Sequence, residues 1–472
     1  MSSSQKSSAT VTTARHPLRR LFDGCTDCDI CRFLMDESCL LFPEMYRLYD
    51  EALAQKQSPS LEVLNDLTDR CTLCGLCPCP DVRSNVILAK AMRTRRQGLE
   101  PGARVLSDVQ TFARLGRKAP RVANALLSLP AVRRLLEKVF QLHAHRRLPP
   151  LATEDFFSWA AKEGLSRKGT PPPGTVRIAY FVGCTAAYLF PEVARAVVQV
   201  FRAAGAHIEV PPQQCCGMPT VVEGDMPRSL QRITANMSTL LRAVQDGFHV
   251  VCSCPTCGYF MRSLLKENAC LATGCLETAP QAEPQKRGAA GQPWHEVPKA
   301  LGSPQSTSGQ TYGPSSLADD AFSSLSPSER LQLAQNLWDV GEALGRLRHE
   351  YGWHPRWRPL KGRWIYYAPC HQREQNIGTP YFDLLQEIPG LELKRVGSST
   401  DCCGMGGSLG YKKAFHEKSL QLGASLMDKI IKEAPEAIVT DCLSCRLQFQ
   451  HVLGLSVHHP VEVLARALAA PR

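Results

Sequence analysis

The chain has 472 residues, a formal net charge of +11 at pH 7 and 21 cysteines. This length exceeds that of a single hydrophobic core, so we expect two or three domains. No uninterrupted apolar stretch reaches the roughly 18 to 20 residues that span a bilayer, which predicts a soluble or peripheral protein outside the oxidising compartments. In that setting cysteines serve as metal ligands more often than as disulfides.

The N-terminal 100 residues contain two cysteine triplets with two-residue gaps. Residues 1–20 are rich in Ser, Thr and basic side chains, which predicts a disordered tail. Residues 21–100 are expected to form a small helical domain, in which Ser60 caps one helix. Loops with such gaps are typical of [4Fe-4S] clusters, whose fourth ligand comes from the other run. The sequence therefore predicts two ferredoxin-type sites, one with Cys25, Cys28, Cys31 and Cys79, the other with Cys39, Cys71, Cys74 and Cys77.

A basic segment follows. Residues 81–150 carry fifteen Lys or Arg against four Asp or Glu, a surplus equal to the charge of the whole chain. We expect a helical linker over residues 101–170, with an apolar stripe from Val132 to Phe140 that packs inward or, alternatively, covers a partner or a membrane surface. Side chains between Arg83 and Arg147, among them Arg133, Arg134 and Arg146, are expected to dock on a partner subunit or on anionic lipid. A solvated helical face is the alternative.

The remaining chain contains a duplicated cysteine pattern. From residue 176, short apolar runs alternate with helical segments, and the same order returns after residue 363, which predicts repeated βαβ units. Equivalent cysteines are offset by 186, 187 and 188 residues, which indicates an internal duplication. We expect two α/β cysteine-rich domains at residues 171–270 and 329–472. Residues 271–328, rich in Pro, Gly, Ser and Gln, are predicted to be a disordered insertion between them.

Each duplicated half supplies five cysteines. Parallel sheets bind their ligands beyond the carboxyl ends of the strands, and adjacent cysteines suit an opened, non-cubane cluster better than the corners of a cubane. Gly217 and Gly404 allow tight turns beside the cysteine pairs. The predicted ligands are Cys184, Cys215, Cys216, Cys254 and Cys257 in the first half, and Cys370, Cys402, Cys403, Cys442 and Cys445 in the second.

Four residues near these sets receive less specific predictions. Cys252, Cys270 and Cys275 fit neither set and are expected to be ordinary thiols. His371 is expected to be part of the loop structure, and a hydrogen bond to sulfur or substrate is the alternative.

Because no flavin or nicotinamide fingerprint opens a helix, another polypeptide must oxidise the organic substrate.

These motifs resemble known families. The doubled order of one cysteine, Cys-Cys-Gly and a spaced pair resembles the cysteine-rich domain of the heterodisulfide reductase and glycolate oxidase iron-sulfur subunits. CTLCGLCPCPDV, QLHAHRRLPP and DFFSW resemble the C subunits of anaerobic glycerol-3-phosphate dehydrogenase. The resemblance implies an α+β multidomain fold, with an N-terminal α-helical ferredoxin domain followed by two cysteine-rich domains.

The same resemblance implies a function. Two [4Fe-4S] clusters and one or two non-cubane clusters would relay electrons between a flavoprotein dehydrogenase and membrane quinone or a membrane subunit. The chain would lie in the cytoplasm, peripherally associated with the inner face of the cell membrane. Two alternatives stay open: a heterodisulfide reductase-like subunit that reduces a disulfide, and a zinc-stabilised binding protein. Sparse aromatics and the lack of a nucleic-acid motif argue against a nucleic-acid partner.

Overall fold

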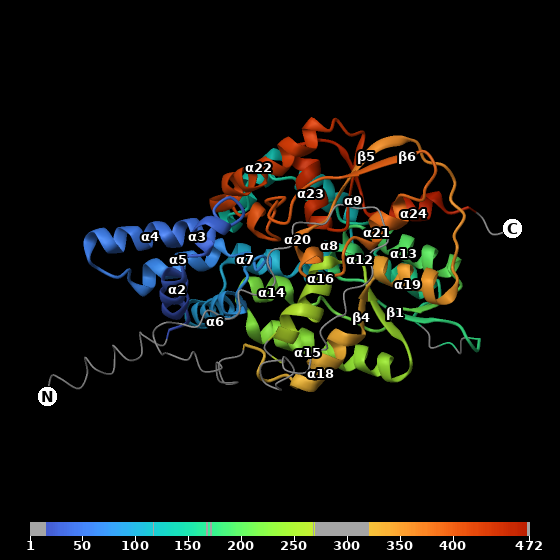
Figure 1. Ribbon diagram of the computed structural model, residues 1–472, viewed down its shortest axis with the longest axis horizontal. Helices are drawn as coiled ribbons and strands as arrows, with labels where there is room; N and C mark the ends of the chain where they lie inside the picture. Colours follow the sequence, from blue (N-terminus) through green and yellow to red (C-terminus); the bar gives the residue numbers. More distant parts are fainter. Residues whose placement is uncertain are drawn as a thin grey trace.

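The computed structural model describes residues 16–116, 118–166, 169, 172–267, 269 and 321–469. Helices from the N-terminal part lie at one end of the molecule, and two parallel sheets with their helices form the rest (Figure 1). The predicted insertion at 271–328 lies outside the described residues except for 321–328. The predicted tail of 20 residues is too long, because a helix already begins at Pro17.

The N-terminal part is helical, as predicted. Ser60 caps α5, since its Oγ accepts a hydrogen bond from the amide of Val63 at 3.3 Å. Proline at the first turn of α2 and α6 costs no hydrogen bond there. Phe42 and Leu64 are fully buried between these helices. The helices are α2 (Pro17–Cys28), α3 (Cys31–Leu34), α4 (Leu41–Gln55), α5 (Leu61–Arg70) and α6 (Pro80–Gln97).

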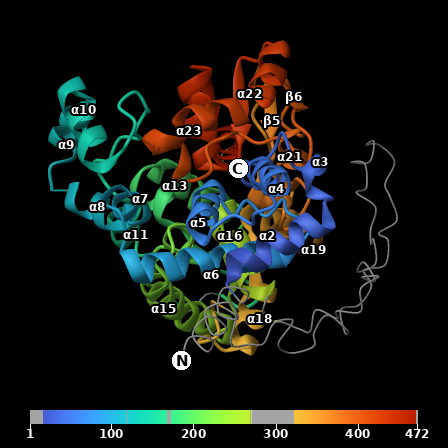
Figure 2. The ribbon, with the colours of Figure 1, turned by 90° about the vertical axis from the view of Figure 1, so that its left-hand side faces the viewer.

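The connecting segment is helical too, but its apolar stripe faces outward. The expectation that this stripe packs inward is wrong for Leu135 and Val139, which are 58% and 50% exposed, whereas the other stripe residues are half-buried. Two of its helices, α9 and α10, lie at the edge of the molecule (Figure 2), where α10 packs against α7. Within the described residues, every helix is too short or too polar to cross a membrane. The segment contains α7 (Pro101–Ser107), α8 (Val109–Gly116), α9 (Pro120–Ser128), α10 (Pro130–Phe140) and α11 (Phe156–Lys162).

The first sheet has four parallel strands in the order β2-β1-β3-β4. The strands are β1 (Arg177–Phe181), β2 (His207–Glu209), β3 (His249–Cys252) and β4 (Leu337–Asp339). The α-helices of this half are α12 (Cys184–Tyr188), α13 (Pro191–Ala203), α14 (Met218–Val222), α15 (Met226–Gln245), α16 (Pro255–Tyr259), α18 (Pro327–Asn336) and α19 (Val340–Tyr351), and a π-helical turn, η1 (Phe260–Leu264), follows α16.

The second sheet repeats this topology in the order β6-β5-β7-β8. Its strands are β5 (Gly362–Tyr367), β6 (Leu391–Arg395), β7 (Ala437–Thr440) and β8 (Ser456–His458). The helices are α20 (Cys370–Arg373), α21 (Pro380–Leu385), η3 (Leu409–Tyr411), η4 (Lys413–Phe415), α22 (His416–Lys432), α23 (Leu443–Val452) and α24 (Pro460–Ala467).

The boundary predicted between the duplicated halves is wrong. β4 pairs with β3, with Val250 opposite Leu337 and Cys252 opposite Asp339, so the chain from α18 to α19 completes the first sheet. In the second half, α23 leads directly to the equivalent strand β8. The insertion therefore interrupts the first unit before its fourth strand, and the constant cysteine offsets could not reveal this because they end at β3 and β7.

The two halves pack against each other through helices. α24 of the second half lies against α13 of the first, and the side-chain amide of Gln199 donates to the carbonyl of Ala465 at 3.2 Å. His459 is fully buried, and its Nε2 lies 3.2 Å from the carbonyl oxygen of Ser253. Ser253 and His459 follow β3 and β8 directly, so this contact joins the carboxyl ends of the two sheets.

Candidate metal centres

The first N-terminal triplet lies beside a cysteine that is distant in sequence. Cys25 and Cys28 are in the last turn of α2, and Cys31 begins α3. Burial raises the pKa of the Cys25 thiol to about 12, and the neighbouring thiols of Cys31, Cys79 and Cys28 add to the increase. The fold thus brings Cys79, at the start of α6, to the first triplet.

The second triplet has a distant neighbour of its own. Burial raises the pKa of Cys77 well above its ordinary value, and the thiols of Cys74, Cys71 and Cys39 add to the shift. The structure therefore groups the eight N-terminal cysteines in the two quartets that the spacing predicted. Their role as ligands remains a prediction.

Buried cations of α6 hold the second triplet in place. Arg83 donates from Nη1 to the carbonyl oxygens of Gly75 and Cys77, at 3.1 and 2.8 Å. Lys90 donates from Nζ to the carbonyl of Cys71 at 2.9 Å. A loop without helix or strand needs such partners, since buried carbonyl groups are costly to leave unpaired. These two residues of the basic segment are therefore structural.

The first five-cysteine set converges beyond the carboxyl ends of β1, β2 and β3. Cys184 begins α12, and its Sγ lies 3.5 Å from that of Cys215. Hydrogen bonding with Cys215 raises the pKa of Cys216 well above its ordinary value, and Cys257 is also within hydrogen-bonding contact. Cys254 completes the group as a neighbour of Cys257 and Cys215.

The second set has the same arrangement. The Sγ atoms of Cys403 and Cys445 lie 3.1 Å apart. Hydrogen bonding with Cys403 raises the pKa of Cys402 well above its ordinary value. Burial raises the pKa of Cys370, and its neighbours include Cys403 and Cys442. The fold thus assembles all ten predicted cysteines in two groups of five.

The glycines beside the cysteine pairs are required by the turn. Gly217 and Gly404 have φ of +100° and +83°, in the region that favours glycine. A Cβ on Gly404 would lie 2.0 Å from the carbonyl oxygen of Ser419. The predicted role of both glycines is confirmed.

The donor set fits iron-sulfur clusters better than zinc. The described cysteines are all free thiols, and most members of the five-cysteine sets are buried. Buried thiolates need a bound cation to offset the cost of removing their charge from water. Five thiols with an adjacent pair exceed the four corners of a tetrahedral zinc site, whereas thiolate ligands alone are what iron-sulfur clusters use.

Cys252 is a sixth thiol that the sequence interpretation set aside. It ends β3, where its Sγ accepts from the amide of Cys254 at 3.4 Å, and it contacts Cys257. Cys252 lies opposite Phe181 in the first sheet, as Thr440 lies opposite Tyr367 in the second. The duplication could have drawn attention to this position. Cys270 and Cys275 lie outside the described residues.

His371 has a structural role, as expected, although it lies in the short helix α20 and not in a loop. Its Nε2 lies 3.1 Å from the carbonyl oxygen of Leu73, and its Nδ1 lies 3.0 Å from Oγ1 of Thr256. The ring stacks on Tyr259 with centroids 4.5 Å apart. Both nitrogens are thus occupied by groups other than sulfur, and the residue ties the second cysteine set to the second N-terminal triplet and to the first half.

Four basic side chains of the basic segment are internal. Arg83, Lys90, Arg133 and Arg146 are each at least nine-tenths buried. Arg133 donates from Nε to the carbonyl of Ala144 at 3.0 Å and from Nη2 to that of Arg146. The prediction is therefore wrong for Arg83, Arg133 and Arg146, which are not available for docking, whereas Arg134 and Arg147 are exposed and docking through them stays a prediction.

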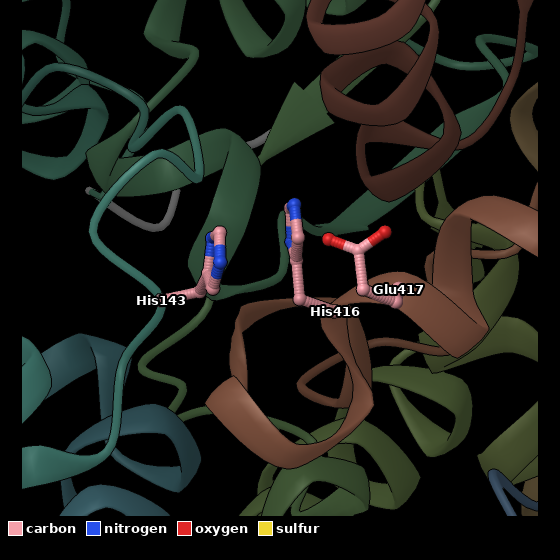
Figure 3. Close-up of side chains that lie close together, drawn as sticks. All are labelled: His143, His416 and Glu417. Atoms are coloured by element: carbon pink, nitrogen blue, oxygen red, sulfur yellow. The ribbon is translucent and has the colours of Figure 1, made fainter.

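A histidine cluster attaches the end of the basic segment to the second half. His143, His416 and Glu417 place one nitrogen or oxygen each within 4.8 Å of the others. The two imidazole rings face each other, with centroids 3.7 Å apart and an angle of 10° between planes (Figure 3). Their in-plane lone pairs therefore run parallel and do not converge on one ion.

The cluster acts as a clamp instead. The amide of His143 donates to the carbonyl of Tyr411 at 2.9 Å, and that of Lys413 donates to the carbonyl of Gln141 at 2.8 Å. Together with the histidine stack, these bonds fix residues 141–147 against the loop that follows the second cysteine pair.

Comparisons with known proteins agree with this geometry. Residues 178–262 and 364–450 match the cysteine-rich domain family, CCG. The C subunit of the anaerobic glycerol-3-phosphate dehydrogenase of Escherichia coli K12 is 25% identical over 82% of this chain and 83% of its own length.

Two further relatives are more distant. The B subunit of a fumarate reductase (CoM/CoB) from Methanothermobacter marburgensis is 24% identical over 66% of this chain and 49% of its own length. Lactate utilization protein A 2 of Bacillus cereus Q1 is 21% identical over 62% of this chain and its full length. The chain thus carries two tandem cysteine-rich CCG domains, each built around one five-cysteine set, and is related to the C subunits of anaerobic glycerol-3-phosphate dehydrogenase.

Proposed function

We propose that this chain is the iron-sulfur electron-transfer subunit of an oxidoreductase complex, and that it relays electrons between a flavoprotein dehydrogenase and the membrane quinone pool. The two N-terminal quartets would form an α-helical ferredoxin domain with two [4Fe-4S] clusters. Each five-thiol set would hold a non-cubane cluster. Such clusters accept and release single electrons when bound. The names of the relatives support a dehydrogenase that oxidises glycerol 3-phosphate or a 2-hydroxy acid.

The observation that carries this proposal is the proximity of Cys74 to Cys370. Burial is the largest cause of the raised pKa of Cys370, and the charge of the nearby Cys74 thiolate is the second largest. Gly75, the residue after Cys74, lies close to the same part of the second half, because a Cβ on Gly75 would meet the side chains of Glu374 and Tyr259. A quartet of the N-terminal part therefore adjoins the second five-thiol set, and an electron passing between them stays within the chain.

Burial of seven of the ten thiols in the five-thiol sets favours relay over catalysis. The exposed fractions of Cys215, Cys216, Cys257 and Cys445 are 3% or less, and that of Cys403 is 6%. A disulfide substrate must reach a sulfur or iron atom, whereas electron transfer needs only proximity. Reduction of a disulfide at these sets, the function that the name of the fumarate reductase (CoM/CoB) relative suggests, is the second candidate.

We also propose that α9 and α10 meet an anionic membrane surface. Val122, Leu126, Leu135 and Val139 on these two helices, and Leu129 between them, are each about half exposed. Exposed basic residues flank them, namely Arg121, Arg134 and Lys138. An apolar face bordered by Lys and Arg is typical of helices that lie in the interface of a bilayer with anionic lipids. The helix pair lies at the edge of the molecule (Figure 2).

Iron analysis and EPR of protein purified without oxygen test the proposed function. Wild-type protein should contain iron and acid-labile sulfide. Cys216→Ser and Cys403→Ser should each remove one distinct EPR signal and leave the signals of the N-terminal pair. Cys252→Ser is the comparison variant, and it should keep both signals because the equivalent position in the second half is already a hydroxyl residue, Thr440. Wild-type protein without acid-labile sulfide would overturn the proposal.

A further inference from the structure

Arg146 is a buried cation at the second five-thiol set. Its exposed fraction is 2%. Nη2 lies 2.5 Å from Sδ of Met405 and donates to the side-chain oxygen of Gln448. Nε and Nη1 have no hydrogen-bond partner among the described residues. Met405 follows Cys403 by two residues and Gln448 follows Cys445 by three, so the guanidinium lies against this set.

The unpaired nitrogens of Arg146 call for a negative neighbour. A buried guanidinium without a counter-charge is costly, yet the clamp at residues 141–147 holds this one in place. The acidic residue nearest in sequence to the cysteine pair, Asp401, is paired with Lys429 at 2.8 Å. Thiolates with bound iron and sulfide carry negative charge, which would compensate Arg146.

Within the described part of the chain, the cation beside the first five-thiol set is compensated. Arg232 faces Cys215, and its Nη2 lies 2.5 Å from Oδ1 of Asp108. The same carboxylate lies 3.4 Å from Arg228, which also faces Asp225 at 3.5 Å. Two carboxylates thus oppose two guanidinium groups, and these four side chains give the first set a neutral surrounding.

A second arginine adds to the difference. Arg373 follows Cys370 by three residues, and the equivalent position after Cys184 is Ala187. Its guanidinium donates to the carbonyls of Ser398 and Asp401 at 2.9 and 2.8 Å. The two sets therefore share their sulfur ligands but differ in the positive charge buried beside them.

We propose that Arg146 raises the reduction potential of the centre bound at the second five-thiol set above that of the first, which makes the second set the electron-accepting end of the chain. Reduction adds one negative charge to a cluster, and a nearby cation in a low-dielectric interior stabilises that charge. Each transfer moves one electron from one thiolate-bound centre to another and needs no further reactant. This inference rests on the proposed function.

Redox titration followed by EPR tests this inference on the complete iron-loaded chain. Arg146→Gln should shift the signal of the second set, identified by its loss in Cys403→Ser, to lower potential. Arg146→Lys should keep most of the wild-type potential, because it keeps the charge. Arg147→Gln is the matched control, since it removes the same charge from an exposed neighbour. An unchanged potential in Arg146→Gln, or an equal shift in Arg147→Gln, would overturn the inference.

If Arg146→Gln loses its iron, a substitution beside the first five-thiol set still tests the inference. Asp108→Asn leaves Arg232 without its counter-charge and should shift the signal of the first set to higher potential. An unchanged potential of the first set in Asp108→Asn would contradict the electrostatic account. Failure of the proposed function is recognised separately, because the wild-type chain would then contain no acid-labile sulfide.

Discussion

His371 and Leu73 join two parts of the chain that are 298 residues apart, through Nε2 of the histidine and the carbonyl oxygen of the leucine at 3.1 Å. We expect His371→Asn to loosen the 71–77 loop, because it removes this bond and the stack on Tyr259. Amide hydrogen exchange of residues 71–77 should become faster, because the free energy of local opening of this loop should fall by about 1 to 3 kcal/mol. His349→Asn, an exposed histidine, should leave exchange unchanged. Equal exchange in wild type and His371→Asn would contradict the role of this contact.

The grouping of the N-terminal cysteines predicts which variants share a phenotype. Cys79→Ser should remove the same EPR signal as Cys25→Ser, since both thiols belong to one quartet. Cys39→Ser should instead match Cys71→Ser. The double variant of Cys25 and Cys79 should lose no more iron than either single variant. Loss of the same signal in Cys79→Ser and Cys71→Ser would show that the quartets are wrong.

The exposed face of α9 and α10 predicts membrane binding. Leu126→Asp combined with Leu135→Asp should weaken binding to vesicles of anionic phospholipid by at least about tenfold, because each buried leucine contributes about 1.5 to 3 kcal/mol. Sedimentation with vesicles measures this. Leu53→Asp is the control, since Leu53 is 60% exposed on α4, away from this helix pair. Binding that survives the double substitution would rule out this surface.

His459 predicts a pH dependence of stability. Burial lowers the pKa of His459 from 6.5 to about 3. Between pH 6.5 and pH 3 the histidine is protonated in the unfolded chain but not in the folded chain. The contribution of the buried, neutral His459 to the free energy of unfolding is therefore complete above pH 6.5 and declines as the pH falls toward 3. The loss at pH 5 is about 2 kcal/mol.

The matching measurement compares the melting temperature at pH 7.5 and pH 5. His459 accepts from the amide of Val461 as the cap of α24, and asparagine can also act as a cap. His459→Asn should therefore show a smaller drop between the two pH values than wild type. His354→Asn, an exposed histidine, should drop as wild type does. An equal drop in His459→Asn and wild type would mean that another group dominates the acid response.

Cysteine spacing and glycine positions were sufficient to predict the five-thiol groups. Cys215-Cys216-Gly217 and Cys402-Cys403-Gly404 are fixed by covalent order, and they follow the short strands β2 and β6. The fourth strand of the first sheet, β4, however, comes after the insertion in the sequence. Strand pairing is a contact between distant segments, so no local pattern indicates that Leu337 pairs with Val250.

What the sequence determined by itself is the chemistry: thiols at ligand spacing, the duplication and the absence of a nucleotide fingerprint. The tertiary structure alone decided which charges and apolar side chains are buried. Arg146 lies inside and Arg147 outside, although they are neighbours, because Met405 and Gln448 cover only the first. Periodicity shows that α10 has an apolar face, but whether another element covers that face depends on packing between segments far apart in the chain.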